Sequence, residues 1–365
     1  MNFFHTHISP RAIELAAETL KSTYISEGKL VRQFEQELSR QFGLVQPVAV
    51  NSGTSALHLG LSVAGIRPGD EVIVPPQTFV ASAFAILMCG ATPVFADIQP
   101  MTGNLDPVSA RAKITRRTRA IMPVHWSGYP CDMDELNALA REHSLVVIED
   151  AAQALGATYK GRPIGSISRL TAFSFQAIKH LTTGDGGALC CLDEPDYLEA
   201  RRKRWFGIDR ERDQASMLGE RQYDLAEPGF KYHLNDLGAA VGLGNLPDVR
   251  ANLARHRHIA RTYREALVQV SGVTLLESRS DRESAYWVFT LLVERRQDFV
   301  RALKSRGVPT SVVHQRIDRN RVFGGMRADL EGQALFDARQ IALPVHPGLS
   351  DQHIGQIIGA VREGW

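Results

Sequence analysis

Two patterns of apolar residues alternate along the first two thirds of the chain. Short runs rich in β-branched residues predict strands at 47–50, 71–75, 92–97, 119–126, 145–150, 171–175 and 186–192. Apolar residues at helical spacing predict helices between several of these strands, at 55–65, 79–90 and 132–144. Strands that are apolar on both faces and alternate with helices are typical of a mostly parallel sheet covered by helices. The sequence therefore predicts an α/β fold.

The pattern changes near residue 246. A long helix-like segment, 248–272, leads into a strand at 286–293 and a helix at 296–307, and a last helix follows Ser350 and Asp351, which suit its N-terminal cap. We interpret this as a smaller α+β domain. The expected organisation is a large α/β domain over 1–245 and a small C-terminal domain over 246–365.

Composition narrows the range of functions. The chain of 365 residues has 42 basic and 40 acidic residues, a net charge of +2, so no nucleic-acid partner is expected. Neither an N-terminal signal nor an apolar run of about 20 residues is visible, which favours a soluble, cytoplasmic protein without a membrane partner. The four cysteines lack CxxC spacing and are expected to be buried thiols, with no metal site. They are Cys89, Cys131, Cys190 and Cys191.

Two motifs follow predicted strands, where open α/β sheets bind ligands. In NSGTSALHLG, Gly53, Thr54 and Ser55 open a helix, and helix N–H groups with small hydroxyls suit a phosphate. The same residues are also ordinary helix caps. In VVIEDAAQALGA, Asp150 ends an apolar strand, where a carboxylate is costly unless a cation or a hydrogen bond meets it. The alternative is a cap for the next helix.

The third motif is FSFQAIKHLTTGDGG, residues 173–187. Strand alternation turns Ser174 away from Phe173 and Phe175, so its hydroxyl and the amine of Lys179 can converge. A lone loop lysine is ordinarily a solvated charge. Together with the phosphate-sized turn and the buried Asp150, however, this lysine completes the groups that pyridoxal phosphate needs.

These motifs, together with GDEVIVPPQTFVAS and the closing LPVHPGLSD, resemble the DegT/StrS family of pyridoxal-phosphate sugar aminotransferases of fold type I. The resemblance covers nearly the whole chain and is densest from residue 45 to residue 245. It implies the cofactor pyridoxal 5′-phosphate, L-glutamate as amino donor and a nucleotide-linked keto-6-deoxy sugar as acceptor.

The resemblance also implies roles for single residues. Lys179 corresponds to the lysine that forms the Schiff base and moves the proton, Asp150 to the partner of the pyridine nitrogen, and Gln153 to the partner of the phenolic oxygen. Phe79 corresponds to the aromatic residue that stacks on the ring. The expected phosphate-binding residues are Gly53, Thr54, Ser55 and Ser174.

One position departs from the family pattern. Many members have an asparagine that reaches the phosphate in the neighbouring subunit, where this chain has Lys231 in GFKYHLND. Asn235 or His233 could replace it, and a lysine could meet phosphate as a point charge. The pattern implies a homodimer with shared active sites.

Substrate contacts are predicted in two arginine-rich segments, 201–212 and 311–323. The candidate residues there are Trp205 and His314, and His180 of the lysine motif is a third candidate. Related dehydratases have a histidine in place of the lysine. Here Lys179 is present and His180 only follows it, which favours transamination over a sugar dehydratase.

The sequence leaves other functions to compare with this one. The scaffold could aminate a free cyclitol ketone, or the chain could be a cofactor-bound regulator without turnover, although a regulator has no physical reason to retain Lys179. A dinucleotide-dependent oxidoreductase is disfavoured because no GxGxxG turn follows a strand.

Overall fold

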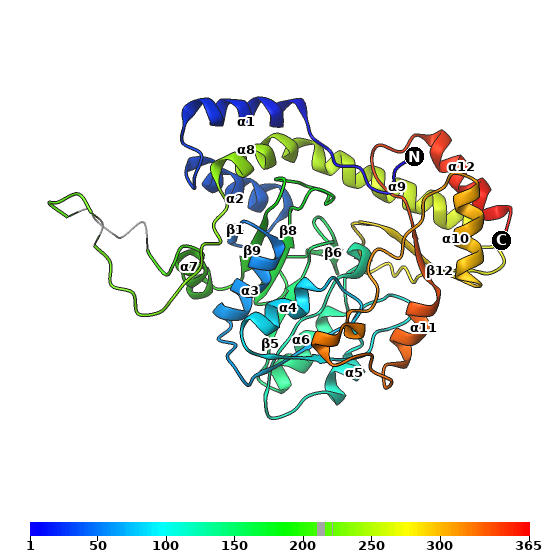
Figure 1. Cartoon of the computed structure of the whole chain (residues 1–365), viewed down its shortest axis with the longest axis horizontal. Coiled ribbons are helices and arrows are strands. Elements are labelled where there is room, and N and C mark those ends of the chain that lie inside the picture. The colour runs from blue at the N-terminus through cyan, green and yellow to red at the C-terminus, as the bar shows by residue number, and fades with distance from the viewer. Residues whose placement is uncertain (210–215, 221) are drawn as a thin grey trace.

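The computed structural model describes residues 1–209, 216–220 and 222–365 (Figure 1). Its central sheet has seven strands in the order β1-β9-β8-β5-β4-β2-β3. Neighbours from β8 to β3 pair in parallel, whereas β9 is antiparallel to both β8 and β1. This confirms the predicted mostly parallel sheet. The strands are β1 Pro47–Val50, β2 Glu71–Val74, β3 Thr92–Phe95, β4 Thr118–Ile121, β5 Val146–Asp150, β8 Leu170–Ser174 and β9 Gly187–Cys191.

Helices cover both faces of this sheet, because alternate side chains of each strand are apolar on opposite faces. Val48 joins one core, with α3, α4 and α7, while its neighbour Ala49 joins the other, with α2, α5, α6 and α8. The helices are α2 Lys29–Phe42, α3 Gly53–Val63, α4 Ala81–Met88, α5 Pro107–Ala112, α6 Met133–Glu142, α7 Glu194–Lys203 and α8 Asp236–Asn245. The fold class is the predicted α/β architecture.

The N-terminal segment adds two helices that the sequence analysis did not predict, α1 (Pro10–Ser22) and α2. Ser9 caps α1, and its hydroxyl accepts a hydrogen bond from Ala12 N. Helix α1 packs along α8 (Figure 1). The buried carboxylate of Asp236 accepts hydrogen bonds from the amides of Gly28 and Val31, so the start of α2 is also fixed to α8.

A second sheet, β10-β12-β13, is antiparallel and lies in the C-terminal part of the chain. Its strands are β10 Val273–Leu275, β12 Phe289–Val293 and β13 Gln340–Leu343, and it shares a core with α9 Val249–Leu267, α10 Arg296–Ser305 and α12 Asp351–Arg362. Ser350 caps α12 as predicted, since its hydroxyl accepts from His353 N at 3.2 Å. Helix α8 continues through η2 (Leu246–Asp248) directly into α9, so the proposed domain boundary falls within a run of helices.

Short elements connect the two sheets. A third, small sheet has the order β11-β6-β7 and brings residues after 280 onto the loop before β8. Its strands are β6 Thr158–Tyr159, β7 Arg162–Pro163 and β11 Arg282–Glu283, and the remaining elements are η1 Trp126–Gly128, η3 Ile317–Arg319, η4 Arg321–Phe323 and α11 Glu331–Arg339.

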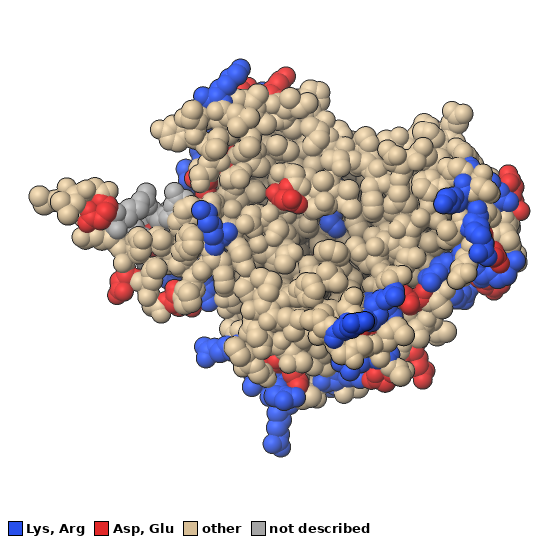
Figure 2. Space-filling model, viewed as in Figure 1, with Lys and Arg blue, Asp and Glu red and all other residues tan. Residues whose placement is uncertain are grey.

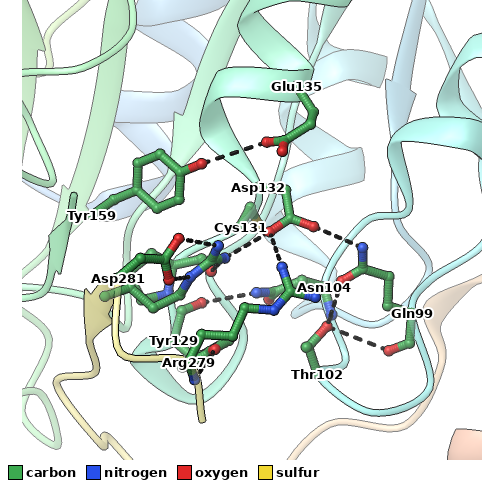
Figure 3. Close-up of polar contacts among 12 residues, drawn as sticks. Gln99, Thr102, Asn104, Tyr129, Cys131, Asp132, Glu135, Tyr159, Arg279 and Asp281 are labelled. Atoms are coloured by element: carbon green, nitrogen blue, oxygen red, sulfur yellow. Dashed lines mark hydrogen bonds and ion pairs between the residues drawn. The ribbon is translucent and has the colours of Figure 1, made fainter. Parts of the chain in front are cut away.

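A polar cluster fixes this connection (Figure 3). The buried carboxylate of Asp132 accepts from Gln99 Nε2 and from Arg279 Nη1, both at 2.8 Å, and pairs with Arg282 at 2.8 Å. Through Arg279 and Arg282, the segment around β11 is thereby anchored to loops of the large sheet. Because a buried carboxylate is stable only when it is paired and hydrogen-bonded, the cluster is a structural joint.

The surface and the cysteines agree with the composition. Figure 2 shows acidic and basic side chains interspersed along the edges of the face in view, around a largely uncharged centre. Three cysteines are buried, as expected, and Cys89 is partly buried, which raises the pKa of its thiol to about 11.

Within the described ranges, every helix is too short or too polar to cross a bilayer.

Candidate active site

A cavity of about 360 Å³ lies at the carboxyl ends of β5 and β8, beside the first turn of α3. This is the edge of the sheet where the motifs predict ligand binding. The volume lies within the usual range for small-molecule sites. Eight of the predicted site residues line it: Gly53, Thr54, Phe79, Asp150, Gln153, Ser174, Lys179 and His314.

Lys179 reaches the cavity from the loop that follows β8. Phe175 holds both ends of this loop, since its amide donates to Gly186 O at 2.8 Å and its carbonyl accepts from Thr183 N at 3.0 Å. The run of threonines and glycines thus serves to close the loop. Burial lowers the pKa of the Lys179 amine to about 8, and the nearby carboxylate of Asp150 acts in the opposite direction. An amine with such a pKa can both take up and release a proton near neutral pH.

Asp150 ends β5 and is 6 % exposed. Its Oδ2 accepts from Ser82 Oγ at 2.7 Å, and its Oδ1 accepts from Ala152 N at 3.1 Å. The carboxylate is therefore held in one orientation while it lines the cavity. The elements that follow β5 are the short strands β6 and β7, so Asp150 is not the cap of a helix, and its bond to Ala152 N stabilises the turn after the strand.

The first turn of α3 forms one end of the cavity. Ser52 is the N-cap, and its Oγ accepts from Ser55 N at 3.0 Å. A Cβ atom on Gly53 would lie 2.8 Å from Ser174 Cβ, so only glycine permits this close approach. The helix N-terminus and the Ser174 hydroxyl consequently share one small space that suits a phosphate.

Ser55, one of the predicted phosphate-binding residues, lies outside the cavity. Its hydroxyl donates to Asn51 Oδ1 at 2.6 Å and contacts Ser52 Oγ at 2.9 Å, and it is not among the cavity-lining residues. Ser52 lines the cavity instead. The cause is the helical turn, which points the third residue of α3 back toward the preceding strand.

Gln153, Phe79 and His314 complete the predicted lining. Gln153 Oε1 accepts from Ser127 N at 2.7 Å, which leaves its amide NH₂ group as a donor. The Phe79 ring is 54 % exposed and lies 5.2 Å from the His314 ring. Burial and the nearby Lys179 amine lower the pKa of His314 to about 4, so its imidazole is neutral at physiological pH.

The structure places His180, a predicted substrate contact, outside this cavity. His180 points away from the cavity, is 6 % exposed, and its Nε2 donates to Ala285 O at 2.9 Å. Its ring lies 4.9 Å from that of His256. Because His180 directly follows Lys179 in the loop, the two side chains project to opposite sides of it.

Trp205, Lys231 and Asn235 lie outside the cavity of the single chain. Trp205 forms an isolated bridge with Lys231, and its ring packs 3.8 Å from that of His233. Asn235 caps α8 and accepts from Gly238 N. Their predicted contacts, across a subunit interface or with a sugar, stay predictions.

One arginine of each arginine-rich segment is engaged within the protein. Arg204 pairs with Glu35 at 2.5 Å and with Glu27 at 2.7 Å, and Arg316 pairs with Asp318 at 2.6 Å. These guanidinium groups are therefore committed to internal carboxylates. Residues 210–212 of the first segment lie outside the described residues.

The sequence analysis missed several lining residues, of which Trp287 and Asp185 carry the most chemistry. Trp287 precedes β12 and is 2 % exposed. It lay inside a segment interpreted as strand, where an apolar aromatic residue gives no signal of a site. Asp185 belongs to the glycine-rich part of the lysine loop and could have been noted from its place in that motif.

The residues present fit pyridoxal phosphate. One cavity is lined by an amine of lowered pKa, by an oriented carboxylate and by the N-terminus of a helix. At that N-terminus the space beside Gly53 is too small for a Cβ atom. These groups match what the cofactor's aldehyde, ring nitrogen and phosphate need. Fold and site together define a pyridoxal-phosphate enzyme of fold type I.

Comparison with known proteins identifies the family. Residues 6–362 match the DegT/DnrJ/EryC1/StrS aminotransferase family, and the chain belongs to it. It is 40% identical over 368 residues to the spore coat polysaccharide biosynthesis protein SpsC of Bacillus subtilis (strain 168), covering 98% of this chain and 95% of that protein. It is 36% identical to the GDP-perosamine synthase of Caulobacter vibrioides, covering 95% and 93%.

Solved structures agree. The sugar aminotransferase CalS13 from Micromonospora echinospora superposes with a TM-score of 0.94 at 36% identity, covering 100% of both chains. Similar structures also include PLP and PMP forms of a putative sugar aminotransferase from Streptococcus pneumoniae. The chain is thus a pyridoxal-phosphate-dependent aminotransferase, as the sequence motifs implied.

Proposed function

We propose that the protein transfers the amino group of L-glutamate to the ketone of a nucleotide-linked 6-deoxy sugar. The observation that carries this proposal is the convergence of Lys179, Asp150 and the α3 N-terminus on one cavity. The similarity to a GDP-perosamine synthase and to a spore coat polysaccharide protein supports a nucleotide-linked acceptor for cell-surface polysaccharide.

Each cavity residue has a proposed task. Gly53, Thr54 and Ser174 would bind the phosphate, Asp150 would hold the ring nitrogen protonated, and Gln153 would donate to the phenolic oxygen. The Phe79 ring would cover one face of the cofactor. When bound, pyridoxal phosphate supplies an electron sink for the electrons of the substrate C–H bond.

Lys179 is the proposed acid–base group. Its neutral amine would take the proton from the α-carbon of glutamate, and the resulting ammonium would deliver that proton to a carbon of the bound cofactor. On the ketone acceptor the same two transfers would run in reverse. A pKa of about 8 leaves both forms accessible near neutral pH.

Replacement of this lysine tests the function. Lys179→Ala and Lys179→Arg are expected to reduce transamination by at least about a thousandfold, because they remove the proton carrier. Thermal unfolding checks that the fold is intact. Full transamination by a folded variant would contradict the proposal.

We also propose a homodimer with shared active sites. Ile13, Leu20 and Tyr24, on and just after α1, are 64 %, 54 % and 82 % exposed, and Met217 and Leu218 are fully or almost fully exposed. Such apolar surface favours association. Lys231, Asn235 and Trp205 would then meet the neighbouring cavity. Analytical ultracentrifugation would test this, and a monomer at micromolar concentration would contradict it.

A further inference from the structure

Four aromatic rings from distant parts of the chain form a continuous row beside the cavity. Phe4 of the N-terminal segment stacks on Trp287 at 5.4 Å, Trp287 stacks on His314 at 5.7 Å, and His314 lies 5.2 Å from Phe79. Both stacked pairs have interplanar angles near 25°. Trp287 is at the centre of this row, and its indole stacks with two neighbouring rings, those of Phe4 and His314.

Trp287 contacts the lysine loop at two adjacent residues. Its Nε1–H donates to Ile178 O at 2.9 Å, which ties the indole to the residue before Lys179. The Lys179 Nζ lies 3.7 Å from the centroid of the indole ring. Tryptophan is the side chain that attracts a cation most strongly through its ring face, and the interaction is strongest where water is excluded.

The charged and titratable groups near the Lys179 amine show how much the ring contact can stabilise its protonated form. On the cavity side, Lys179 shares its surroundings with Asp150, Asp185 and His314. The Asp150 carboxylate already accepts from Ser82 and Ala152, and burial keeps the pKa of His314 low, so that ring adds no positive charge near neutral pH.

Histidines line a second, small cavity that Lys179 also borders. This cavity behind the loop is lined by His5, His7, His180, His256 and His346. Burial lowers the pKa of His180, His256 and His346, so these imidazoles are neutral at physiological pH. The direct contact of the Lys179 amine on this side is the face of the Trp287 ring.

We propose that the face of the Trp287 indole is the docking position of the Lys179 amine whenever that amine carries a proton and is not bonded to the cofactor. The inference rests on the proposed acid–base role of Lys179. In that role the substrate C–H bond would break and leave its electron pair to the bound cofactor, an N–H bond would form on Lys179, and the nitrogen would then deliver the proton to a carbon of the cofactor. Trp287 is a positioning residue that stabilises the ammonium between these two transfers.

The test replaces Trp287 by tryptophans with an increasing number of ring fluorines, introduced at this position alone. Fluorine withdraws electron density from the ring face but preserves the shape and the N–H donor, so a purely structural role would be unaffected. In the apoprotein, the pKa of Lys179 is measured from the pH dependence of its acetylation rate, followed by mass spectrometry. It is expected to fall stepwise, by about one pH unit for the fully fluorinated ring.

The same substitution at Trp365 is the matched control. This tryptophan packs on Phe299 at 4.8 Å and donates to Glu294 O, remote from the cavity, and its fluorination should leave the pKa of Lys179 unchanged. A complementary variant, Trp287→Phe, loses the hydrogen bond to Ile178. It should lower kcat about tenfold with KM for glutamate within about twofold, since binding contacts are retained.

The outcomes separate this inference from the proposed function. A Lys179 pKa that does not respond to fluorination of Trp287, in a protein where Lys179→Ala abolishes transamination, overturns the docking position alone. Transamination that survives Lys179→Ala overturns the role of the lysine itself. A stepwise fall of the pKa in the Trp287 series, absent in the Trp365 series, supports the inference.

Discussion

The cavity has two walls that are built in different ways. The strand-end wall, Gly53, Asp150 and Ser174, stands on the termini of α3, β5 and β8. The loop wall, Trp287 and His314, follows residues with left-handed backbone, Tyr286 at φ 49° and Val313 at φ 55°. A β-branched residue in that region is rare and strained. Regular elements thus orient the polar groups, whereas strained loops place the aromatic faces.

The difference suggests a division of labour. The strand-end wall offers a helix N-terminus, a carboxylate and a hydroxyl, the groups that bind a charged cofactor. The loop wall offers an indole, which contacts the lysine, and a neutral imidazole, which lines the cavity. Substitutions on the two walls should therefore have effects of different kind and size.

Asp150→Asn on the strand-end wall should have the largest effect. An amide can accept the hydrogen bonds of Ser82 or Ala152 but cannot hold a cationic ring nitrogen, so we expect kcat to fall by about a hundredfold or more while the fold is retained. Steady-state kinetics and circular dichroism measure the two quantities. Activity within tenfold of the parent would show that the carboxylate does not act on the ring.

Gly53→Ala tests the close approach in the same wall. The added Cβ would lie 2.8 Å from Ser174 Cβ, so we expect a loss of about 1–3 kcal/mol in the free energy of unfolding and weaker cofactor binding. Urea unfolding and cofactor titration measure these changes.

Gly359→Ala in α12 is the matched control. A Cβ there meets no atom within 4 Å, and alanine favours a helix over glycine, so stability should rise by about 0.5–1 kcal/mol. Equal behaviour of the two variants would contradict the tight cradle.

The pH dependence of stability tests the loop wall. Burial lowers the pKa of His314 and of His256 to about 4, below the value near 6.5 expected in the unfolded chain. Between these values the unfolded state binds more protons, so the free energy of unfolding decreases as pH falls from about 6.5 to 4. Each histidine should contribute about 1–3 kcal/mol to this loss.

Urea unfolding at pH 7 and pH 5 checks the sign. His314→Phe should reduce the difference between the two pH values, whereas His258→Gln, at an exposed position of α9, should leave it unchanged. Stability that increases on acidification would contradict the neutral state of the buried imidazoles.

Phe4→Leu should have the smallest effect. Leucine keeps apolar contact with Trp287 but loses the stacking at 5.4 Å, which costs about 0.5–1.5 kcal/mol. Hydrogen exchange of residues 2–7 should accelerate, because the segment is held there by this ring and by the His346 Nε2 contact with Asn2 O. Unchanged exchange would indicate that the segment is held elsewhere.

The two walls also differ in how far the sequence predicts them. Apolar periodicity located β5 and β8, and so placed Asp150 and Ser174 at one sheet edge. It could not locate Trp287, because a tryptophan in a strand-like run is indistinguishable from a core residue until the two sheets are packed. The motifs offered Ser55 as a phosphate contact and His180 as a substrate contact, but both side chains lie outside the cavity, since the side from which each projects depends on the local turn.

Helices α1 and α2 were missed for a related reason. Their positions depend on contacts with α8, more than 200 residues away along the chain, such as that of Asp236 with Gly28. The motif-bearing loops were predictable because their chemistry is local. The elements that complete the site depend on packing between distant segments.

The most direct test of the account is the visible absorption spectrum of the purified protein with pyridoxal phosphate, before and after addition of L-glutamate. We expect a long-wavelength band of bound cofactor that requires Lys179 and that glutamate converts to a shorter-wavelength band. A protein that binds no cofactor, or whose band is unchanged by glutamate, would contradict the proposed amino transfer from this donor.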